Sequence, residues 1–113
     1  MQDCIFCKIV AGEIPTEALW QDEHVFVFRD INPVAPVHLL IIPKKHIATV
    51  NDFGDDHSIA GAMVNAAAQV AKQLDISESG YRLVWNVNKG AGQEVFHVHA
   101  HLLAGRNLGW PPG

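Results

Sequence analysis

Apolar and polar residues alternate along this chain in two rhythms, one typical of β-strands and one typical of an α-helix. Short β-rich runs predict strands at 24–30, 38–42, 81–87 and 96–103. The run at 38–42 is continuously apolar, as in strands that are buried on both faces. Between about Asp55 and Leu74, in contrast, apolar residues recur at helical spacing and predict one long helix.

The composition of the predicted helix agrees with its spacing. Its apolar stripe consists of Ile59, Met63, Ala66, Ala67, Val70 and Leu74. Alanines, the strongest helix formers, fill the intervals, and Asp55 and Asp56 complement the helix dipole near its start. Strands, one long helix and then strands, without βαβ alternation, indicate an α+β fold with a mainly antiparallel sheet. A chain of 113 residues predicts a single domain, spanning 1–113.

The last predicted strand carries three histidines at alternate positions, His97, His99 and His101. Because side chains at i, i+2 and i+4 of a strand share a face, the three imidazoles should line one side of the sheet, with the intervening apolar residues buried. A single histidine is often a hydrogen-bonded core residue. A row of three titratable rings is costly without a function, so the motif predicts a functional site.

Two functional interpretations of this histidine row compete. In the first it is a metal site, because His-x-His on a strand can supply two zinc ligands. In the second it is a nucleophilic site, because a neutral imidazole nitrogen is a good nucleophile and neighbouring rings can hold its tautomer and contact phosphate oxygens. The glycine-bearing segment 89–94 directly precedes the row, and its backbone N–H groups could form an anion-binding nest. This neighbour favours the nucleophilic site.

The segment from Gly92 to Leu103, GQEVFHVHAHLL, resembles the signature of the histidine triad family, and the resemblance extends over nearly the whole chain. It includes the segments 5–9, 13–15, 28–31, 33–38, 42–46, 80–82 and 110–113. Within the family the chain is most similar to the branch of nucleotide-binding proteins that act as purine nucleoside phosphoramidases. The resemblance implies a five-stranded, mainly antiparallel sheet with one long helix, extended across a homodimer.

The resemblance also implies catalytic roles for four histidines. His99 would be the nucleophile that attacks the α-phosphorus and forms a nucleotidyl-histidine intermediate. His101 would bind the α-phosphate, and His97 would lie behind the nucleophile. His38 would complete the relay by orienting a neighbouring imidazole.

Nucleotide contacts are implied in the same way. Phosphate-side contacts correspond to Asn86, Gly92, Gln93, Glu94 and the Val95 backbone, the ribose contact to Asp30, and the apolar slot around the base to Ile5, Phe6, Phe28 and Ile31. Without the resemblance, the apolar residues would be assigned to the core and Asp30 to a turn. Glu94 stands where some relatives carry serine, so it either assists the leaving group or is a solvated loop carboxylate. The proton donor to the leaving amine is therefore left open.

Cys4 and Cys7 form a C-x-x-C pair that could be a redox pair, two ordinary thiols or half of a zinc site. No βαβ pattern surrounds it, which argues against a thioredoxin-like motif. Some histidine triad relatives with this pair resemble zinc proteins. There the pair would be joined by the residues corresponding to His46 and His97, so the resemblance implies a structural zinc ion held by Cys4, Cys7, His46 and His97.

Composition and charge narrow the range of partners. A net charge of −4 argues against a nucleic-acid-coating surface, because no stripe of lysine and arginine is available to neutralise many phosphates. No segment predicts a membrane span or a signal peptide, and two cysteines in such a chain suggest a reducing, cytoplasmic compartment.

Three hypotheses of different classes follow. The chain is a hydrolase that cleaves P–N bonds of purine nucleoside 5′-phosphoramidates through a covalent histidine intermediate, a zinc-dependent hydrolase in which histidines hold a catalytic metal, or a nucleotide-binding scaffold module. Only the zinc hydrolase would lose all turnover when metal is stripped, and only the first would form a nucleotidyl-protein.

Overall fold

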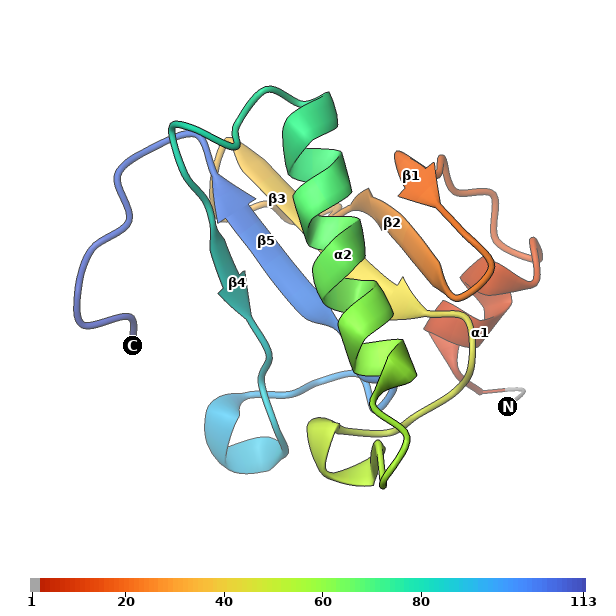
Figure 1. Ribbon diagram of the computed structural model, residues 1–113. Helices are drawn as coiled ribbons and strands as arrows, with labels where there is room; N and C mark the ends of the chain where they lie inside the picture. Colours follow the sequence, from red (N-terminus) through yellow and green to blue (C-terminus); the bar gives the residue numbers. More distant parts are fainter. Residues whose placement is uncertain (1–2) are drawn as a thin grey trace.

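The computed structural model describes residues 3–113, which form an open five-stranded sheet with a helix on each face (Figure 1). The strands are β1 (Trp20–Gln21), β2 (Val25–Arg29), β3 (Val37–Pro43), β4 (Arg82–Val84) and β5 (Ala100–Ala104). They lie in the order β1-β2-β3-β5-β4, and every neighbouring pair is antiparallel. The helices are α1 (Ile5–Val10) and α2 (Ser58–Gln73), with the 3₁₀ turns η1 (Val50–Asp52) and η2 (Lys89–Ala91). The predicted α+β fold with a five-stranded antiparallel sheet is thereby confirmed.

The central strands bury both of their faces, because α1 and α2 cover opposite sides of the sheet. Val25, Val27, Leu39 and Ile41 face α2 and pack with its buried residues. The alternate residues of the same strands face α1 and form a second core; they are Phe26, Phe28, Leu40 and Ile42. This arrangement explains the continuously apolar run in β3, since a strand covered on both faces needs no polar side.

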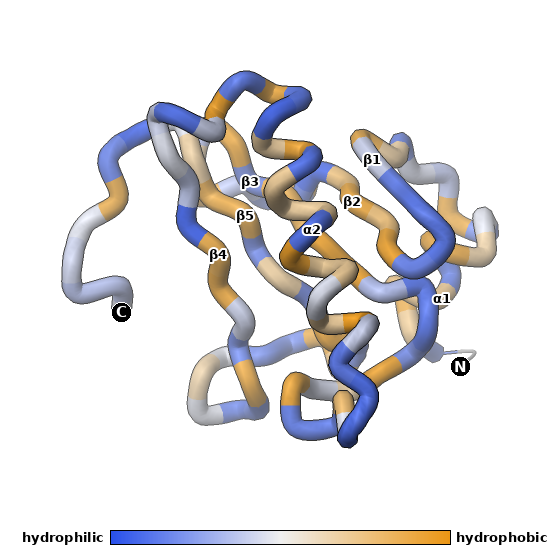
Figure 2. The backbone as a smooth tube through the Cα atoms, in the orientation of Figure 1, coloured by the Kyte–Doolittle hydropathy of each residue, from blue (hydrophilic) through white to orange (hydrophobic). Residues whose placement is uncertain are grey.

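Helix α2 buries the stripe that its spacing predicts. Met63, Ala66, Ala67 and Val70 are almost fully buried, whereas Val64 on the opposite side is 52% exposed. Figure 2 shows apolar residues along β2 and β3 and an alternation of polar and apolar residues along α2. The helix begins at Ser58, and the Asp56 carboxylate accepts a hydrogen bond from the Ser58 backbone N–H at 3.0 Å, just before the first turn.

The predicted strand at 96–103 is wrong at its beginning, because β5 starts only at Ala100. Continued past the pair Ile41–Ala100, the register with β3 would place Pro43 opposite Val98. Pro43 has no N–H to give to the ladder, and its carbonyl oxygen accepts from the His97 side chain at 2.7 Å. The Val98 N–H instead donates to the carbonyl oxygen of Ile47. Residues 96–99 therefore lie outside the sheet, and the side chains of His97 and His99 need not share one of its faces.

Other boundaries also differ from prediction. The strand expected at 81–87 is reduced to the three residues of β4, and α1 and β1 were not predicted at all. Helix α1 is only six residues long, which is too short to show a helical period by itself. No helix within residues 3–113 combines the length and the apolar character that a membrane crossing requires.

Candidate active site

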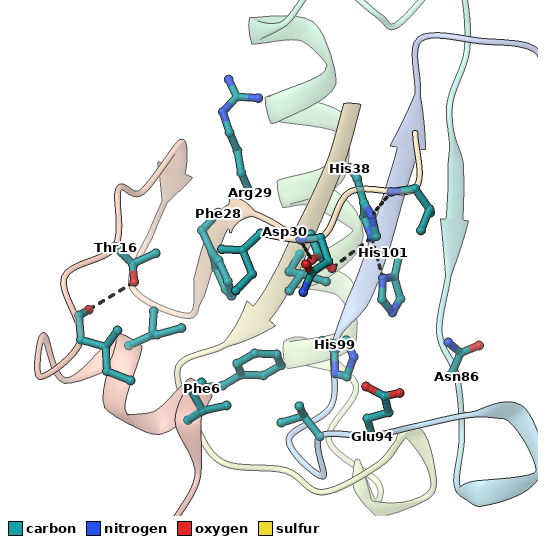
Figure 3. A pocket seen from close by; sticks show the side chains of 18 of the residues that line it. Phe6, Thr16, Phe28, Arg29, Asp30, His38, Asn86, Glu94, His99 and His101 are labelled. Atoms are coloured by element: carbon teal, nitrogen blue, oxygen red, sulfur yellow. Dashed lines mark hydrogen bonds and ion pairs between the residues drawn. The ribbon is translucent and has the colours of Figure 1, made fainter. Parts of the chain in front are cut away.

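A cavity of about 820 Å³ opens on the face of the sheet that carries α1, between that helix, the end of β2 and the loop before β5 (Figure 3). Most of the residues predicted to contact a nucleotide line it. They are Ile5, Phe6, Phe28, Asp30, Ile31, Asn86, Gly92, Glu94, Val95, His99 and His101, and His38, predicted as a relay residue, lines it as well. Its volume is in the range of small-molecule sites, and it has an apolar end and a polar end, as a nucleotide requires.

His99 is held in one tautomer by the backbone beside it. Its Nδ1 atom lies 2.8 Å from the carbonyl oxygen of His97, and a carbonyl can only accept, so Nδ1 carries the proton. The Nε2 atom then keeps its lone pair. Burial lowers the pKa of the His99 imidazole, although the hydrogen bond to His97 opposes this shift. The ring is therefore a neutral imidazole, which is the form that a nucleophile needs.

A second hydrogen-bond chain sets the tautomer of His101. The Val34 backbone N–H donates to His38 Nδ1 at 3.1 Å, so the neutral ring of His38 carries its proton on Nε2. That Nε2–H donates to His101 Nδ1 at 2.9 Å. His101 consequently presents an Nε2–H donor, which is suited to a phosphate oxygen.

The surroundings of His101 also keep it neutral. Burial, followed by the nearby imidazoles of His99 and His38, lowers the pKa of His101 to about 4, while the Asp30 carboxylate opposes the shift. A ring centroid distance of 5.1 Å separates His99 from His101, so both can reach one phosphate group. The site thus pairs an acceptor nitrogen with a donor nitrogen at neutral pH.

Asp30, His38 and His101 lie close enough together to be considered as metal ligands, but their hydrogen bonds favour another role. The two imidazole nitrogens that face each other at 2.9 Å share a proton, and the Asp30 carboxylate lies 3.4 Å from the same His38 Nε2. A metal ion would have to displace that proton. We therefore interpret the three side chains as a hydrogen-bonded relay.

The apolar end of the cavity has a buried floor and an exposed rim. Phe6 and Phe28 are buried and pack edge to face, with ring centroids 5.8 Å apart. Ile31 is 90% exposed and Ile5 is 48% exposed at the rim. Large apolar side chains left open beside a cavity indicate a contact surface for a flat apolar ligand group. Phe6 also packs on the His99 ring, with ring centroids 5.1 Å apart, so it joins the apolar end of the cavity to the histidines.

Gln93 does not line the cavity, although the family resemblance predicts that it contacts the phosphate. Its side chain is buried and bonds only to backbone, accepting from the Asn88 N–H at 2.8 Å and donating to the carbonyl oxygens of Ala48 and Val95. Asn88 has φ 63° and ψ −178°, a conformation that only glycine adopts without strain. Gln93 therefore closes the loop from 88 to 95 and holds a strained residue, while Gly92 and Glu94 on either side of it line the cavity.

The four predicted metal ligands converge beside the cavity. The Sγ atom of Cys4 lies 3.3 Å from His97 Nδ1, and the Sγ atom of Cys7 lies 3.3 Å from His46 Nδ1 and 3.5 Å from His97 Nδ1. A tetrahedral zinc ion separates its sulfur and nitrogen ligands by about 3.3–3.8 Å, so these spacings match. The ligand atoms all lie within 4.8 Å of one another, and this cluster could hold a metal ion.

The tautomer of His97 also fits a metal ligand. Its Nε2–H donates to the Pro43 carbonyl oxygen at 2.7 Å, which leaves the Nδ1 lone pair directed at the two sulfurs. A second-shell carbonyl of this kind typically orients a metal-bound histidine. His97 is fully buried and does not line the cavity, so the structure separates it from His99 and His101.

Some cavity residues were not predicted. They are Ile9, Ile14, Pro15, Thr16, Arg29, Asn32, Val34 and Leu40. Ile9 could have been found, because it follows Ile5 at i+4 and shares a face with it on one helical turn. Leu40 lies on the face of β3 opposite to α2, directly paired with His101. It could be identified only from the strand order.

Comparisons with known proteins agree with this geometry. A family model described as the HIT domain matches residues 11–108. The purine nucleoside phosphoramidase of Escherichia coli (strain K12) is 51% identical over 109 residues, which cover 96% of this chain and 92% of that protein. A HIT family hydrolase from Legionella pneumophila Philadelphia 1 shares 54% identity with a TM-score of 0.94, covering 98% of this chain and all of that one.

A histidine triad protein from Clostridium difficile, solved at 0.95 Å resolution, shares 41% identity with a TM-score of 0.93, and the match covers 96% of each chain. The family match spans most of the chain, and relatives at these identities match it nearly end to end. This chain therefore belongs to the HIT domain family, the histidine triad family that its sequence resembles.

Proposed function

We propose that this HIT-family hydrolase cleaves the P–N bond of purine nucleoside 5′-phosphoramidates through a covalent nucleotidyl-histidine intermediate. The observation that carries the proposal is the lone pair of His99 Nε2 in a nucleotide-sized cavity, with the proton of the ring held on Nδ1 by the His97 carbonyl oxygen. The name of the E. coli relative, purine nucleoside phosphoramidase, supports the substrate class.

The reaction would proceed by two displacements at phosphorus. In the first, the Nε2 lone pair of His99 forms a bond to the α-phosphorus, the P–N bond breaks, and the amine takes up a proton and departs. In the second, water attacks the same phosphorus and gives up a proton to solvent, which balances the proton taken up by the amine, while the bond to Nε2 breaks and the nucleoside monophosphate leaves. His101 Nε2–H would donate to a phosphate oxygen in both steps, which stabilises the charge that develops there.

His38 would act as a positioning residue. It contacts His101 rather than the phosphate, and its own tautomer is set by the Val34 N–H. The base would lie in the slot formed by Ile5, Phe6, Phe28 and Ile31, and the ribose hydroxyls would donate to Asp30. These placements follow the order of the residues along the cavity, from the apolar end to the histidines.

We also propose that Cys4, Cys7, His46 and His97 bind a structural zinc ion. Two thiols and two imidazoles form a closed tetrahedral set without an open position for substrate, so the ion would supply stability and not catalysis. Its ligands come from α1, from the segment after β3 and from the segment before β5. The ion would thereby fix α1, which carries Phe6, against the sheet.

A homodimer is the assembly we propose. Strand β4 is an edge of the sheet and is only partly buried, and the other edge, β1, has two residues. Pairing of two β4 edges would extend the sheet across the dimer and remove the exposed edge. Trp110, 82% exposed near the end of the chain, would then contact the partner close to its active site. We propose a cytoplasmic location as well, which the two free cysteines support.

A turnover screen tests the proposed reaction against its alternatives. Adenosine and guanosine phosphoramidates would be compared with diadenosine polyphosphates and sugar nucleotides, before and after metal is removed. We expect phosphoramidates to be hydrolysed fastest, with turnover retained in the metal-free enzyme. Complete loss of turnover on metal removal would favour the zinc-dependent hydrolase, and absence of turnover with every substrate would favour a nucleotide-binding scaffold.

A further inference from the structure

The edge of the cavity that would receive the leaving group carries a carboxylate, and within residues 3–113 no lysine or arginine lines this edge. If the base lies on the floor formed by Phe6 and Phe28, the ribose at Asp30 and the phosphate at His99 and His101, the remaining wall is formed by Asn86, Gly92 and Glu94. Figure 3 shows the Glu94 carboxylate beside His99, on the side toward Asn86 and away from Phe6. A leaving group on the phosphorus would then lie beside this wall.

The charges that face this wall are of one sign. Arg29 is the only lysine or arginine among the described residues that line the cavity, and its exposed side chain points away from His99 in Figure 3. His101 accepts the His38 Nε2–H on its Nδ1 atom, so its ring is neutral and adds no positive charge here. The carboxylates of Asp30 and Glu94 therefore dominate the potential at the phosphate end.

The loop that carries Glu94 is held in place by its neighbour. The buried amide of Gln93 makes three hydrogen bonds to backbone atoms, to Asn88, Ala48 and Val95, and Gly92 adopts a left-handed conformation with φ 83°. Gln93 therefore points into the protein while the next side chain points into the cavity. The backbone of Glu94 is therefore held at a defined place beside the cavity, and its exposed side chain extends from that place.

We propose that Glu94 determines specificity for the leaving group, favouring amines that carry a positive charge and disfavouring those that carry a negative charge. This inference rests on the proposed function and adds the chemical class of the amine. The carboxylate attracts a cation on the departing amine and repels carboxylates or phosphates there. It acts through charge and need not transfer a proton, so its effect appears in the ratio of the rates for oppositely charged amines.

Three matched substrates and three variants test the inference. The substrates are adenosine 5′-phosphoramidates of 1,4-diaminobutane, n-butylamine and 4-aminobutyrate, which present a positive, a neutral and a negative end at similar length. The variants are Glu94→Gln, Glu94→Lys and the control Glu78→Gln, which changes an exposed glutamate that does not line the cavity. Melting temperatures show whether each variant is folded.

For the unaltered enzyme we expect kcat/KM to be highest for the substrate with the positive end, lower for the neutral one and lowest for the one with the negative end. A unit charge at close range in water changes an affinity by about fivefold, so Glu94→Gln should reduce the ratio of positive to negative substrate by about fivefold or more. Glu94→Lys should make the negative substrate the faster of the two. High salt should bring the ratio closer to one in the unaltered enzyme. Glu78→Gln should leave the ratio unchanged, and the n-butylamine substrate gives the reference rate to which the two charged substrates are normalised in each variant.

Two outcomes would overturn the inference, and they differ in what they mean for the proposed function. Turnover of all three substrates with a ratio that Glu94→Gln and Glu94→Lys do not alter would reject the role of Glu94 and leave the phosphoramidase intact. No turnover of any of the three by the unaltered enzyme would reject both proposals together.

Discussion

The Nδ1 atom of His99 lies 2.8 Å from the backbone carbonyl oxygen of His97, two residues earlier in the chain. This contact depends on the departure of residues 96–99 from the sheet, because a carbonyl engaged in a regular ladder would point to a neighbouring strand. The backbone thereby selects the tautomer of the proposed nucleophile. No second side chain is needed for this task.

The low pKa of His101 predicts a stability that depends on pH. In the unfolded chain the ring binds a proton near pH 6.5, whereas in the folded protein it does so only near pH 4. Between these values the unfolded state binds more protons, so stability should fall as the pH is lowered from 6.5 to 4. Because the ring is only partly buried, we expect its contribution to be about 1 kcal/mol.

Urea unfolding at pH 7 and pH 4.5 measures this effect. A variant with His101→Asn cannot titrate at this position, so its stability should decrease less between the two pH values than that of the unaltered protein. His38, Asp30 and His99 face the same ring and are present in both proteins. Equal pH dependence of the two proteins would show that His101 is not held neutral by folding.

The Cys/His cluster predicts a loss of stability when its thiols are removed. The double variant Cys4→Ser, Cys7→Ser keeps the helix cap, because the Cys4 side chain accepts from the Cys7 N–H and serine can do the same. We expect about one zinc per chain in the unaltered protein and a melting temperature lower by several degrees in the variant. Turnover should fall much less than in a His99 variant.

A chelator provides the matched control for this prediction. It should lower the melting temperature of the unaltered protein and leave that of the double variant unchanged, since the variant has no site to lose. The zinc prediction is contradicted if elemental analysis finds only trace zinc and a chelator does not alter the melting temperature. The two cysteines are then ordinary thiols.

The Gln93 side chain predicts a coupled effect on stability and turnover. Gln93→Ala leaves the Asn88 N–H and the carbonyl oxygens of Ala48 and Val95 without their partner, which should destabilise the protein by about 2 kcal/mol. It should also lower kcat about tenfold, because Gly92 and the Val95 backbone, which would contact the phosphate, lose their fixed position. Gln69→Ala changes an exposed glutamine of α2 and should alter neither quantity. Unchanged kcat in Gln93→Ala would mean that the loop needs no anchor.

The proposed dimer predicts a scattering mass of twice one chain at micromolar concentration. Deletion of 110–113 should leave the fold intact, since Trp110 is largely exposed within one chain, but it should lower turnover if this segment reaches the partner's site. A monomeric mass for the full chain would contradict the dimer. A dimer whose turnover survives the deletion would remove only the role of the C-terminal segment.

Much of the site was predictable because the signal lies in local spacing. The alternation of His97, His99 and His101, the glycine loop before them and the stripe of α2 are all short-range patterns, and the family and the fold that they predict are confirmed. The segregation of His97 from the other two rings was not visible in the alternation. It arises because Pro43 interrupts the ladder, which depends on the register between β3 and β5.

Gln93 and α1 show the same limit. Gln93 lies inside the motif, yet its bonds to Ala48 and Asn88 come from segments that only the fold brings together. Helix α1 is too short for its period to be recognised, and its position follows from Phe6 and Ile9 packing on the far face of the sheet. Long-range contacts of this kind leave no pattern in a single sequence.

The most direct test of the central claim is mass spectrometry of rapidly quenched enzyme during turnover of an adenosine phosphoramidate. We expect a nucleotidyl adduct on His99 and none in His99→Asn, whose turnover should fall below about a hundredth of normal, a loss of about 2.7 kcal/mol in barrier. The variant should remain folded and bind mononucleotide, because only the attacking nitrogen is lost. An adduct on another residue, or a His99→Asn enzyme that keeps more than about a hundredth of its kcat, would contradict covalent catalysis by His99.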